Sequence, residues 1–246
     1  MNKELLDRQN KSLSIVTHDL KSPMVAIIGC SRFLLRDMRN KPHDPNWPQM
    51  LERMVKAGEG MLELIETILA MGKMEAGKEH VEPEWIEDPG DELRETAATF
   101  EYEAGAKGIR LSVDLRTPMP MVYWDMFRLR HHVFNNIISN ALKFTPAGGS
   151  VTLSAARREN QVDIRVSDTG SGIAPEEWNK IFCRFEQGSV ASRRAFNGAG
   201  LGLYNAHLFV GQHGGTIAVE SSSEKGTVIL VSLPLVKTDS PPPATA

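Results

Sequence analysis

Apolar residues recur in steps of three and four over the first third of the chain. The first such series consists of Leu13, Val16, Leu20, Met24, Ile27, Leu34 and Met38, with the polar Ser31 filling the step between Ile27 and Leu34. This spacing is typical of an amphipathic helix. Three prolines within residues 41–48 interrupt the series, and a second one follows over residues 51–69. The pattern therefore predicts a helical hairpin over residues 1–76.

A single helical hairpin buries little apolar surface. Two copies packed together give a four-helix bundle with a proper core, so we expect a homodimer. The alternative is a hairpin that packs against the rest of its own chain.

Beyond the hairpin, the pattern changes to a mixture of alternating and helical segments. Residues 77–90 combine prolines, glycines and acidic residues, which indicates a linker with one short strand at 81–86. The helices predicted after it are 91–107, 125–142, 175–182 and 201–213. The strands predicted are 109–115, 151–157, 161–168, 216–220 and 226–233. Because strands and helices do not alternate strictly, we predict an α+β fold overall, with an α/β sandwich over residues 91–236. Residues 237–246 are predicted to be a disordered tail.

The composition excludes several classes of protein. Hydrophobic residues make up 41% and charged residues 24%, as in ordinary globular proteins, and the net charge of -3 gives no sign of nucleic-acid binding. Cys30 and Cys183 lack the spacing of a metal site, which favours free thiols in a reducing compartment. No apolar run approaches the roughly 18 residues of a membrane span. We therefore expect a cytoplasmic location and leave a membrane anchor open for a longer parent chain.

Three polar residues share one face of the helix predicted at 125–142. Asn136, Asn140 and Lys143 are spaced four and three apart, whereas a different face is apolar. Amide oxygens are hard ligands suited to Mg²⁺, and a lysine one turn further suits phosphate. The alternative is a solvated polar face.

The segment VDIRVSDTGSGI, residues 162–173, places a carboxylate at the end of an alternating strand. Asp168 has the same parity as the apolar residues before it, so its side chain is expected to point inward. A carboxylate there needs a donor, and the exocyclic amine of adenine would serve. Gly170 and Gly172 would let the backbone approach a flat ligand. The alternative is an ordinary Asp-Thr-Gly turn.

The segment GAGLGL, residues 198–203, is a glycine-rich turn that leads into a helix. Helix starts of this kind offer free N–H groups to phosphate. The polar stretch at 189–197 before it is interpreted as a lid, in which Arg193 and Arg194 either reach phosphates or remain a solvated pair.

His18 lies on the outer face of the first predicted helix, away from its apolar series. Asp19 beside it offers a carboxylate that takes the Nδ1 proton and leaves Nε2 nucleophilic. Pro23 removes a helical hydrogen bond one turn later and weakens the helix there. An exposed histidine without a role is the alternative.

Six segments, in this order, resemble the sensor histidine kinases of two-component systems. SIVTHDLKSPMVAIIG resembles the phosphoacceptor box of that family and NIISNALKFTPAGG its asparagine box. DTGSGI and GAGLGL resemble the two glycine boxes, with IFCRF between them as the phenylalanine box. SSEKGTVILVSLP resembles the final glycine-threonine box. The resemblance covers about residues 5–235.

The resemblance implies a dimerisation and histidine-phosphotransfer hairpin followed by a GHKL-type ATP-binding domain. It implies that His18 accepts the phosphoryl group and that Asp19 accepts its proton. The cofactors implied are ATP and Mg²⁺, with Asn140 as the metal ligand. The other residues implied to bind ATP are Asn136, Lys143, Asp168, Gly170, Gly172, Gly198, Gly200, Leu201, Gly202 and Thr227.

The activity implied is autophosphorylation of His18, followed by phosphotransfer to an aspartate of a response regulator. A sensor domain would lie upstream, outside this chain. Ser22 stands where many members carry Thr or Asn, the position that the family links to dephosphorylation of the regulator, so a phosphatase activity is left open. The arginine that many members carry after the phenylalanine box is absent, and Arg184, Arg193 or Arg194 would have to replace it.

Two alternatives remain at this stage. One is a nucleotide-binding scaffold with a silent kinase that regulates a partner by docking. The other is a GHKL ATPase or serine-directed kinase, which the histidine-bearing hairpin disfavours. The sequence does not identify the signal or the response regulator. It also does not indicate whether one subunit phosphorylates itself or its partner.

Overall fold

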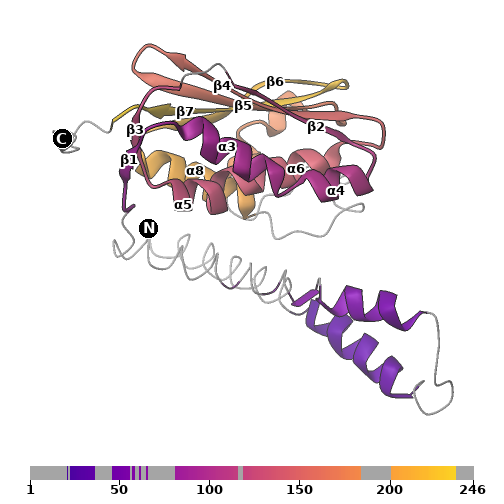
Figure 1. Ribbon diagram of the computed structural model, residues 1–246. Helices are drawn as coiled ribbons and strands as arrows, with labels where there is room; N and C mark the ends of the chain where they lie inside the picture. Colours follow the sequence, from indigo (N-terminus) through magenta and orange to yellow (C-terminus); the bar gives the residue numbers. More distant parts are fainter. Residues whose placement is uncertain are drawn as a thin grey trace, which may run out of the picture. The chain divides into compact units, whose positions relative to one another are not determined.

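The computed structural model describes residues 21, 23–36, 46–55, 57–58, 61, 65, 81–115, 119–183 and 201–236. The chain divides into two compact units, residues 1–79 with 196–201 and residues 80–195 with 202–246, and each is described by itself (Figure 1). The predictions for His18, Asp19, Ser22, Gly198, Gly200, the arginines of the predicted lid and the 237–246 tail lie outside the described residues. None of the helices in the described ranges combines the length and apolar character needed to cross a bilayer.

The first unit is helical, as predicted, over residues 23–36 and 47–55. The Ser31 hydroxyl donates to the Ile27 carbonyl oxygen at 2.8 Å and lies 3.8 Å from the Met54 sulfur, so it joins the two helices. The second helix starts at Trp47, inside the stretch that the prolines predicted to be a break. Pro48 is tolerated because the first turn of a helix needs no intrahelical N–H donor.

Many apolar side chains of this first unit face solvent in the single chain. The exposed ones are Met24, Val25, Ile28, Phe33, Leu35, Leu51, Val55 and Ile65.

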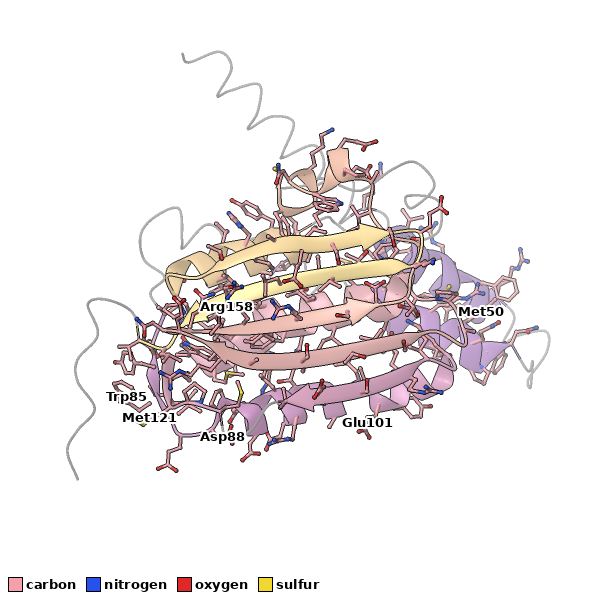
Figure 2. All side chains as sticks on the ribbon, turned by 90° about the horizontal axis from the view of Figure 1, so that it is seen from above. Met50, Trp85, Asp88, Glu101, Met121 and Arg158 are labelled. Carbon is pink, nitrogen blue, oxygen red and sulfur yellow. The ribbon has the colours of Figure 1, made fainter. Side chains whose placement is uncertain are left out.

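The second unit places one sheet against one layer of helices. Figure 1 shows α3 (Pro89–Ala98), α4 (Glu101–Ala106), α6 (Asn135–Phe144) and α8 (Gly202–Gln212) on the same face of the sheet. Figure 2 looks onto the sheet, with its strands side by side. The core lies between the two layers, and its largest fully buried side chains include Phe134, Phe209 and Leu153.

The sheet has five strands in the order β2-β4-β5-β7-β6. They are β2 (Arg110–Leu115), β4 (Ser150–Arg158), β5 (Gln161–Asp168), β7 (Gly226–Pro234) and β6 (Thr216–Ser223). All neighbours are antiparallel except β2 and β4, which are parallel. Alternate residues of β4 and β5, such as Val151, Leu153, Val162 and Ile164, are buried against the helices. The α+β prediction is confirmed.

A separate two-stranded ribbon precedes the sheet. The short strand β1 (Glu84–Ile86) pairs with β3 (Val122–Trp124) in antiparallel register, and Trp85 lies against Tyr123 with ring centroids 5.0 Å apart. Figure 2 labels Trp85 at the left of that view. The sequence predicted β1 but not β3, because three residues are too few to show an alternating pattern.

Several predicted helices differ in detail. The helix predicted at 91–107 begins earlier, at Pro89 after the N-cap Asp88, and is interrupted at Thr99–Phe100. The Thr99 hydroxyl donates to the Thr96 carbonyl oxygen at 2.7 Å, a local bond that competes with helix continuation. The segment predicted as one helix at 175–182 forms two 3₁₀ turns, η2 (Pro175–Glu177) and η3 (Lys180–Phe182).

Candidate nucleotide site

The helix that carries the two asparagines is built in three parts. It starts as α5 (Met126–Arg128), continues as a π-helical segment η1 (Leu129–Phe134) and ends as α6. The predicted apolar face is confirmed, since Leu129, Val133, Ile137 and Ala141 are all buried. The π segment was not predicted. Such segments often occur at functional sites.

Asn136 is held by the π segment. Its Nδ2 donates to the carbonyl oxygen of His132 at 2.8 Å. The imidazole of His132 stacks on the Phe209 ring of α8, with centroids 4.3 Å apart and planes 8° from parallel. The amide oxygen of Asn136 is thereby turned toward α8, where a Cβ placed on Gly202 would lie 2.7 Å from it. The structure thus brings Asn136 and Gly202 together, as a shared site requires.

Asn140 and Lys143 follow on the same helix. Asn140 is half-buried, and its side chain makes no hydrogen bond to any residue that the structure describes. Its amide oxygen is therefore available as a hard ligand. Lys143 is also half-buried, and its Nζ lies 5.3 Å from the centre of the Phe144 ring.

Asp168 ends β5, and its carboxylate is half-buried. Its Oδ1 accepts the backbone N–H of Gly170 at 2.7 Å and that of Thr227 at 3.3 Å. Both bonds end on Oδ1, and Oδ2 accepts none from the described residues. The local turn and the inward carboxylate, which the sequence posed as alternatives, are therefore both present.

Burial raises the pKa of Asp168 above its ordinary value of 3.8. The two backbone N–H donors act in the opposite direction, because they stabilise the charged carboxylate. The net upward shift of the pKa means that the ionised form of this carboxylate is less stable in the folded unit than in water. A buried acceptor with one uncommitted oxygen is suited to receive a ligand's N–H donor.

Two glycines after Asp168 are required by close packing against the protein itself. A Cβ on Gly170 would lie 2.6 Å from the carbonyl oxygen of Phe144, at the end of α6. Gly172 has a φ of +73°, and a Cβ there would overlap the carbonyl oxygen of Ser223. The loop therefore joins the asparagine-bearing helix on one side to the β6–β7 turn on the other. The sequence pattern suggested that both glycines make room for a ligand, and it gave no sign of the contacts with Phe144 and Ser223.

Thr227, near the start of β7, is buried beside Asp168. Its hydroxyl lies 3.0 Å from that of Ser222 on β6. Leu201, just before α8, is also buried. Asp168, Gly170, Gly172 and Thr227 thus form one cluster, and Phe144 connects it to the helix of Asn136, Asn140 and Lys143.

Sequence reasoning missed Ser222 and a second group at the start of α5. There the carboxylate of Asp125 accepts N–H groups from Glu82 and Arg128, and the backbone N–H of Asp125 donates to Nε2 of His213. An aspartate just before a helical pattern is a signal for an N-cap and could have been found. The other contacts join residues far apart in sequence and leave no local pattern.

Comparisons with known proteins cover both units. Residues 8–77 match the family model of the His Kinase A (phospho-acceptor) domain. Residues 125–237 match that of the histidine kinase-, DNA gyrase B-, and HSP90-like ATPase. The chain belongs to the sensor histidine kinases of two-component systems.

Curated relatives agree with this family over nearly the whole chain. The circadian input-output histidine kinase CikA of Thermosynechococcus vestitus is 32% identical over 240 residues, which are 96% of this chain and 32% of the relative. The histidine protein kinase DivJ of Caulobacter vibrioides is 32% identical over 224 residues, which are 91% of this chain and 37% of the relative. The chain thus spans about a third of the length of these two relatives.

Solved structures share the fold. Full-length ShkA, solved in complex with AMPPNP, is 26% identical with a TM-score of 0.66, over 96% of this chain and 48% of that one. ThkA, solved in complex with the response regulator protein TrrA, is 21% identical with a TM-score of 0.68, over 95% of this chain and 64% of that one.

Proposed function

We propose that this chain is the kinase portion of a sensor histidine kinase, which transfers the γ-phosphoryl group of ATP to Nε2 of His18. One observation carries the proposal. A phosphoacceptor model that includes His18 and an ATPase model that includes the whole described asparagine, aspartate and threonine cluster match the same chain. The resemblance assigns Asp19 as the acceptor of the histidine proton.

ATP would occupy the cluster on the second unit. Asp168 would accept a hydrogen bond from the base, with Thr227 beside it, and Asn136 and Lys143 would lie toward the phosphates. Gly170, Gly172, Gly198, Gly200, Leu201 and Gly202 would form the walls and the lid. Support comes from the uncommitted oxygen of Asp168 and from the contact between Asn136 and Gly202. AMPPNP in the complex of the similar ShkA agrees with a nucleotide of this kind.

Mg²⁺ fits the donor set of this site. The amide oxygen of Asn140 is a hard ligand, and it makes no hydrogen bond within the described residues. A Mg²⁺ ion held there would neutralise charge on the phosphates. The chain's own part is then positioning, which dominates catalysis of phosphoryl transfer.

The partners proposed are a second copy of the chain and a response regulator. The exposed apolar residues of the first unit would pack against the same residues of the second copy. The regulator would receive the phosphoryl group on an aspartate, and ThkA, which shares the fold, was solved with a protein of this kind. A phosphatase activity at Ser22 and an upstream sensor domain in a longer parent chain remain predictions.

The experiment that tests the kinase activity uses γ-labelled ATP with Mg²⁺. Asn140→Ala should bind Mg²⁺-ATP poorly and lose labelling by about a hundredfold, as is typical when one preorganised electrostatic group is removed. Alanine is a good helix former, so the fold is retained. The matched control is Ser139→Ala, an exposed neighbour on the same helix, which should label as the wild type does.

The wild type itself separates the kinase from the silent scaffold. Tight binding of ATP without any transfer of label to the protein would contradict autophosphorylation and favour the scaffold.

A further inference from the structure

His132 connects the helix of the two asparagines to α8. It is half-buried in η1, and its ring centroid lies 4.3 Å from that of Phe209, with the two planes 8° from parallel. Its backbone carbonyl oxygen accepts Nδ2 of Asn136, one turn further along the helix, at 2.8 Å. The side chain of His132 therefore contacts α8 while its backbone holds Asn136.

The bond to His132 decides which end of the Asn136 amide faces the start of α8. A carbonyl oxygen carries no hydrogen and can only accept, so the group of Asn136 that faces it is the NH₂ end. The amide oxygen is then the atom nearest to α8, 2.7 Å from the place of a Cβ on Gly202. If the His132 carbonyl moved, the amide would be free to rotate and this oxygen would lose its direction.

Phe209 gives His132 a fixed surface to stack on. It is 1% exposed, and its carbonyl oxygen lies 2.7 Å from Nδ1 of His213. Nε2 of His213 accepts the backbone N–H of Asp125 at 3.1 Å. Phe209 is thus held from the end of α8 that lies away from Gly202, by contacts that do not involve the nucleotide site.

The neighbouring His131 has a ring contact of a different kind. Its ring lies 4.5 Å from that of Phe127, centroid to centroid, and the planes are tilted by 54°. Both residues are exposed, and Phe127 belongs to α5, which continues directly into η1. This contact joins no second element, so His131 provides an internal control for His132.

We propose that His132 is a positioning residue for phosphoryl transfer. By stacking on Phe209 it fixes its own carbonyl oxygen, which in turn directs the amide oxygen of Asn136 toward the start of α8. The inference rests on the proposed function, because it takes Asn136 as a residue that binds ATP. It goes further in assigning the placement of Asn136 to a side chain outside the six segments that resemble the family.

The test measures the dissociation constant of Mg²⁺-ATP by calorimetry. His132→Leu keeps an apolar side chain and a good helix former but lacks a flat ring. It should weaken binding about three- to tenfold, the usual worth of one aromatic pair. His132→Phe restores a ring that stacks on Phe209 and should bind as the wild type does. His131→Leu is the matched control on the preceding residue and should also leave the affinity unchanged.

A double-mutant cycle with Asn136→Ala separates positioning from a general weakening of the fold. Asn136→Ala alone should weaken binding at least as much as His132→Leu, since it removes the whole amide. If His132 acts through Asn136, His132→Leu should cause no further loss of affinity in the Asn136→Ala background.

Two results would overturn the inference while leaving the proposed function standing. One is equal affinity of the His132→Leu and His132→Phe variants, and the other is a full additional loss in the double variant. A wild-type chain that does not bind Mg²⁺-ATP would contradict the proposed function itself, and the inference with it.

Discussion

Asp168 is a carboxylate that the fold partly buries at a cost in free energy, as its raised pKa indicates. Its carboxylate is half-buried, and two backbone N–H groups compensate only one of its oxygens. Burial is the largest influence on its pKa and shifts it upward. A half-buried carboxylate with one oxygen unbonded among the described residues can accept a hydrogen bond from a ligand N–H group.

The first prediction concerns Asp168→Asn and pH. Because the folded pKa is above the ordinary value of 3.8, the folded state holds this proton more tightly than the unfolded chain does. Stability from this group is therefore full at low pH and is lost as pH rises through the folded pKa. The amide that replaces the carboxylate does not titrate and still offers an oxygen to the N–H groups of Gly170 and Thr227. The variant should be more stable than the wild type at neutral pH, yet bind ATP less well.

Urea unfolding at a series of pH values checks this sign. The difference in free energy of unfolding should shrink as pH falls below 3.8, where Asp168 is protonated in both states. Glu224→Gln, an exposed carboxylate in the β6–β7 turn, is the control. A variant that is less stable than the wild type at neutral pH would contradict the account of Asp168.

The second prediction concerns Gly172. Its φ is +73° and a Cβ there would overlap a backbone oxygen, so Gly172→Ala should cost about 1–3 kcal/mol or more of unfolding free energy. Gly211→Ala is a contrasting control, since Gly211 lies in α8 with no atom within 4 Å of its would-be Cβ. That change should stabilise by about 0.5–1 kcal/mol. Equal effects of the two changes in denaturant unfolding would refute the role given to Gly172.

Asp125 joins three elements. It caps α5 through Arg128, its Oδ2 accepts the N–H of Glu82 at the start of the second unit, and its own N–H reaches His213 at the end of α8. Nδ1 of His213 lies 2.7 Å from the Phe209 carbonyl oxygen. Since Nε2 accepts, Nδ1 must carry the proton. The helix of Asn136 and Asn140 is therefore fixed at its start by the segment that enters the unit.

The third prediction is that Asp125→Ala costs about 2–4 kcal/mol, since it removes an N-cap and leaves the Glu82 N–H without its acceptor. Asp125→Asn keeps a side-chain oxygen and should cost less. Hydrogen exchange at the Glu82 amide gives a local readout, and it should accelerate strongly in the alanine variant. Unchanged protection of that amide would show that Asp125 does not hold the entering segment.

Elements with a long regular pattern were predictable, and those set by tertiary contacts were not. The alternation over residues 162–168 predicted both β5 and the inward direction of Asp168, because side-chain direction follows directly from strand parity. The π segment at Leu129–Phe134 left no mark, since its residues fit an ordinary helix pattern. The strand β3 exists because β1 pairs with it, and Ser222 became visible only when β6 and β7 were placed side by side.

At the scale of the whole molecule, the described helices of the first unit expose apolar side chains in the single chain. Val25 is 59% exposed, Leu35 67% and Val55 58%. Helices with such surfaces are unusual in a monomer, and a self-complementary pair of hairpins would bury them.

The fourth prediction is that the protein is a dimer in light scattering after size-exclusion chromatography. Leu35→Glu combined with Val55→Glu should give a monomer that still binds ATP, because the nucleotide cluster lies in the second unit. Tyr102→Glu is the control, since Tyr102 is 89% exposed on that second unit and should leave the dimer intact. A wild-type monomer at micromolar concentration would contradict the proposed assembly.

The central claim is that the chain phosphorylates its own His18. The most direct measurement is peptide mapping of the protein after incubation with Mg²⁺-ATP, kept at alkaline pH, with His18→Gln as the matched variant. The account predicts a phosphoryl group on the peptide that contains His18, lost in acid, stable in base and absent from the variant. An acid-stable phosphoryl group on a serine, or equal labelling of the variant, would contradict it.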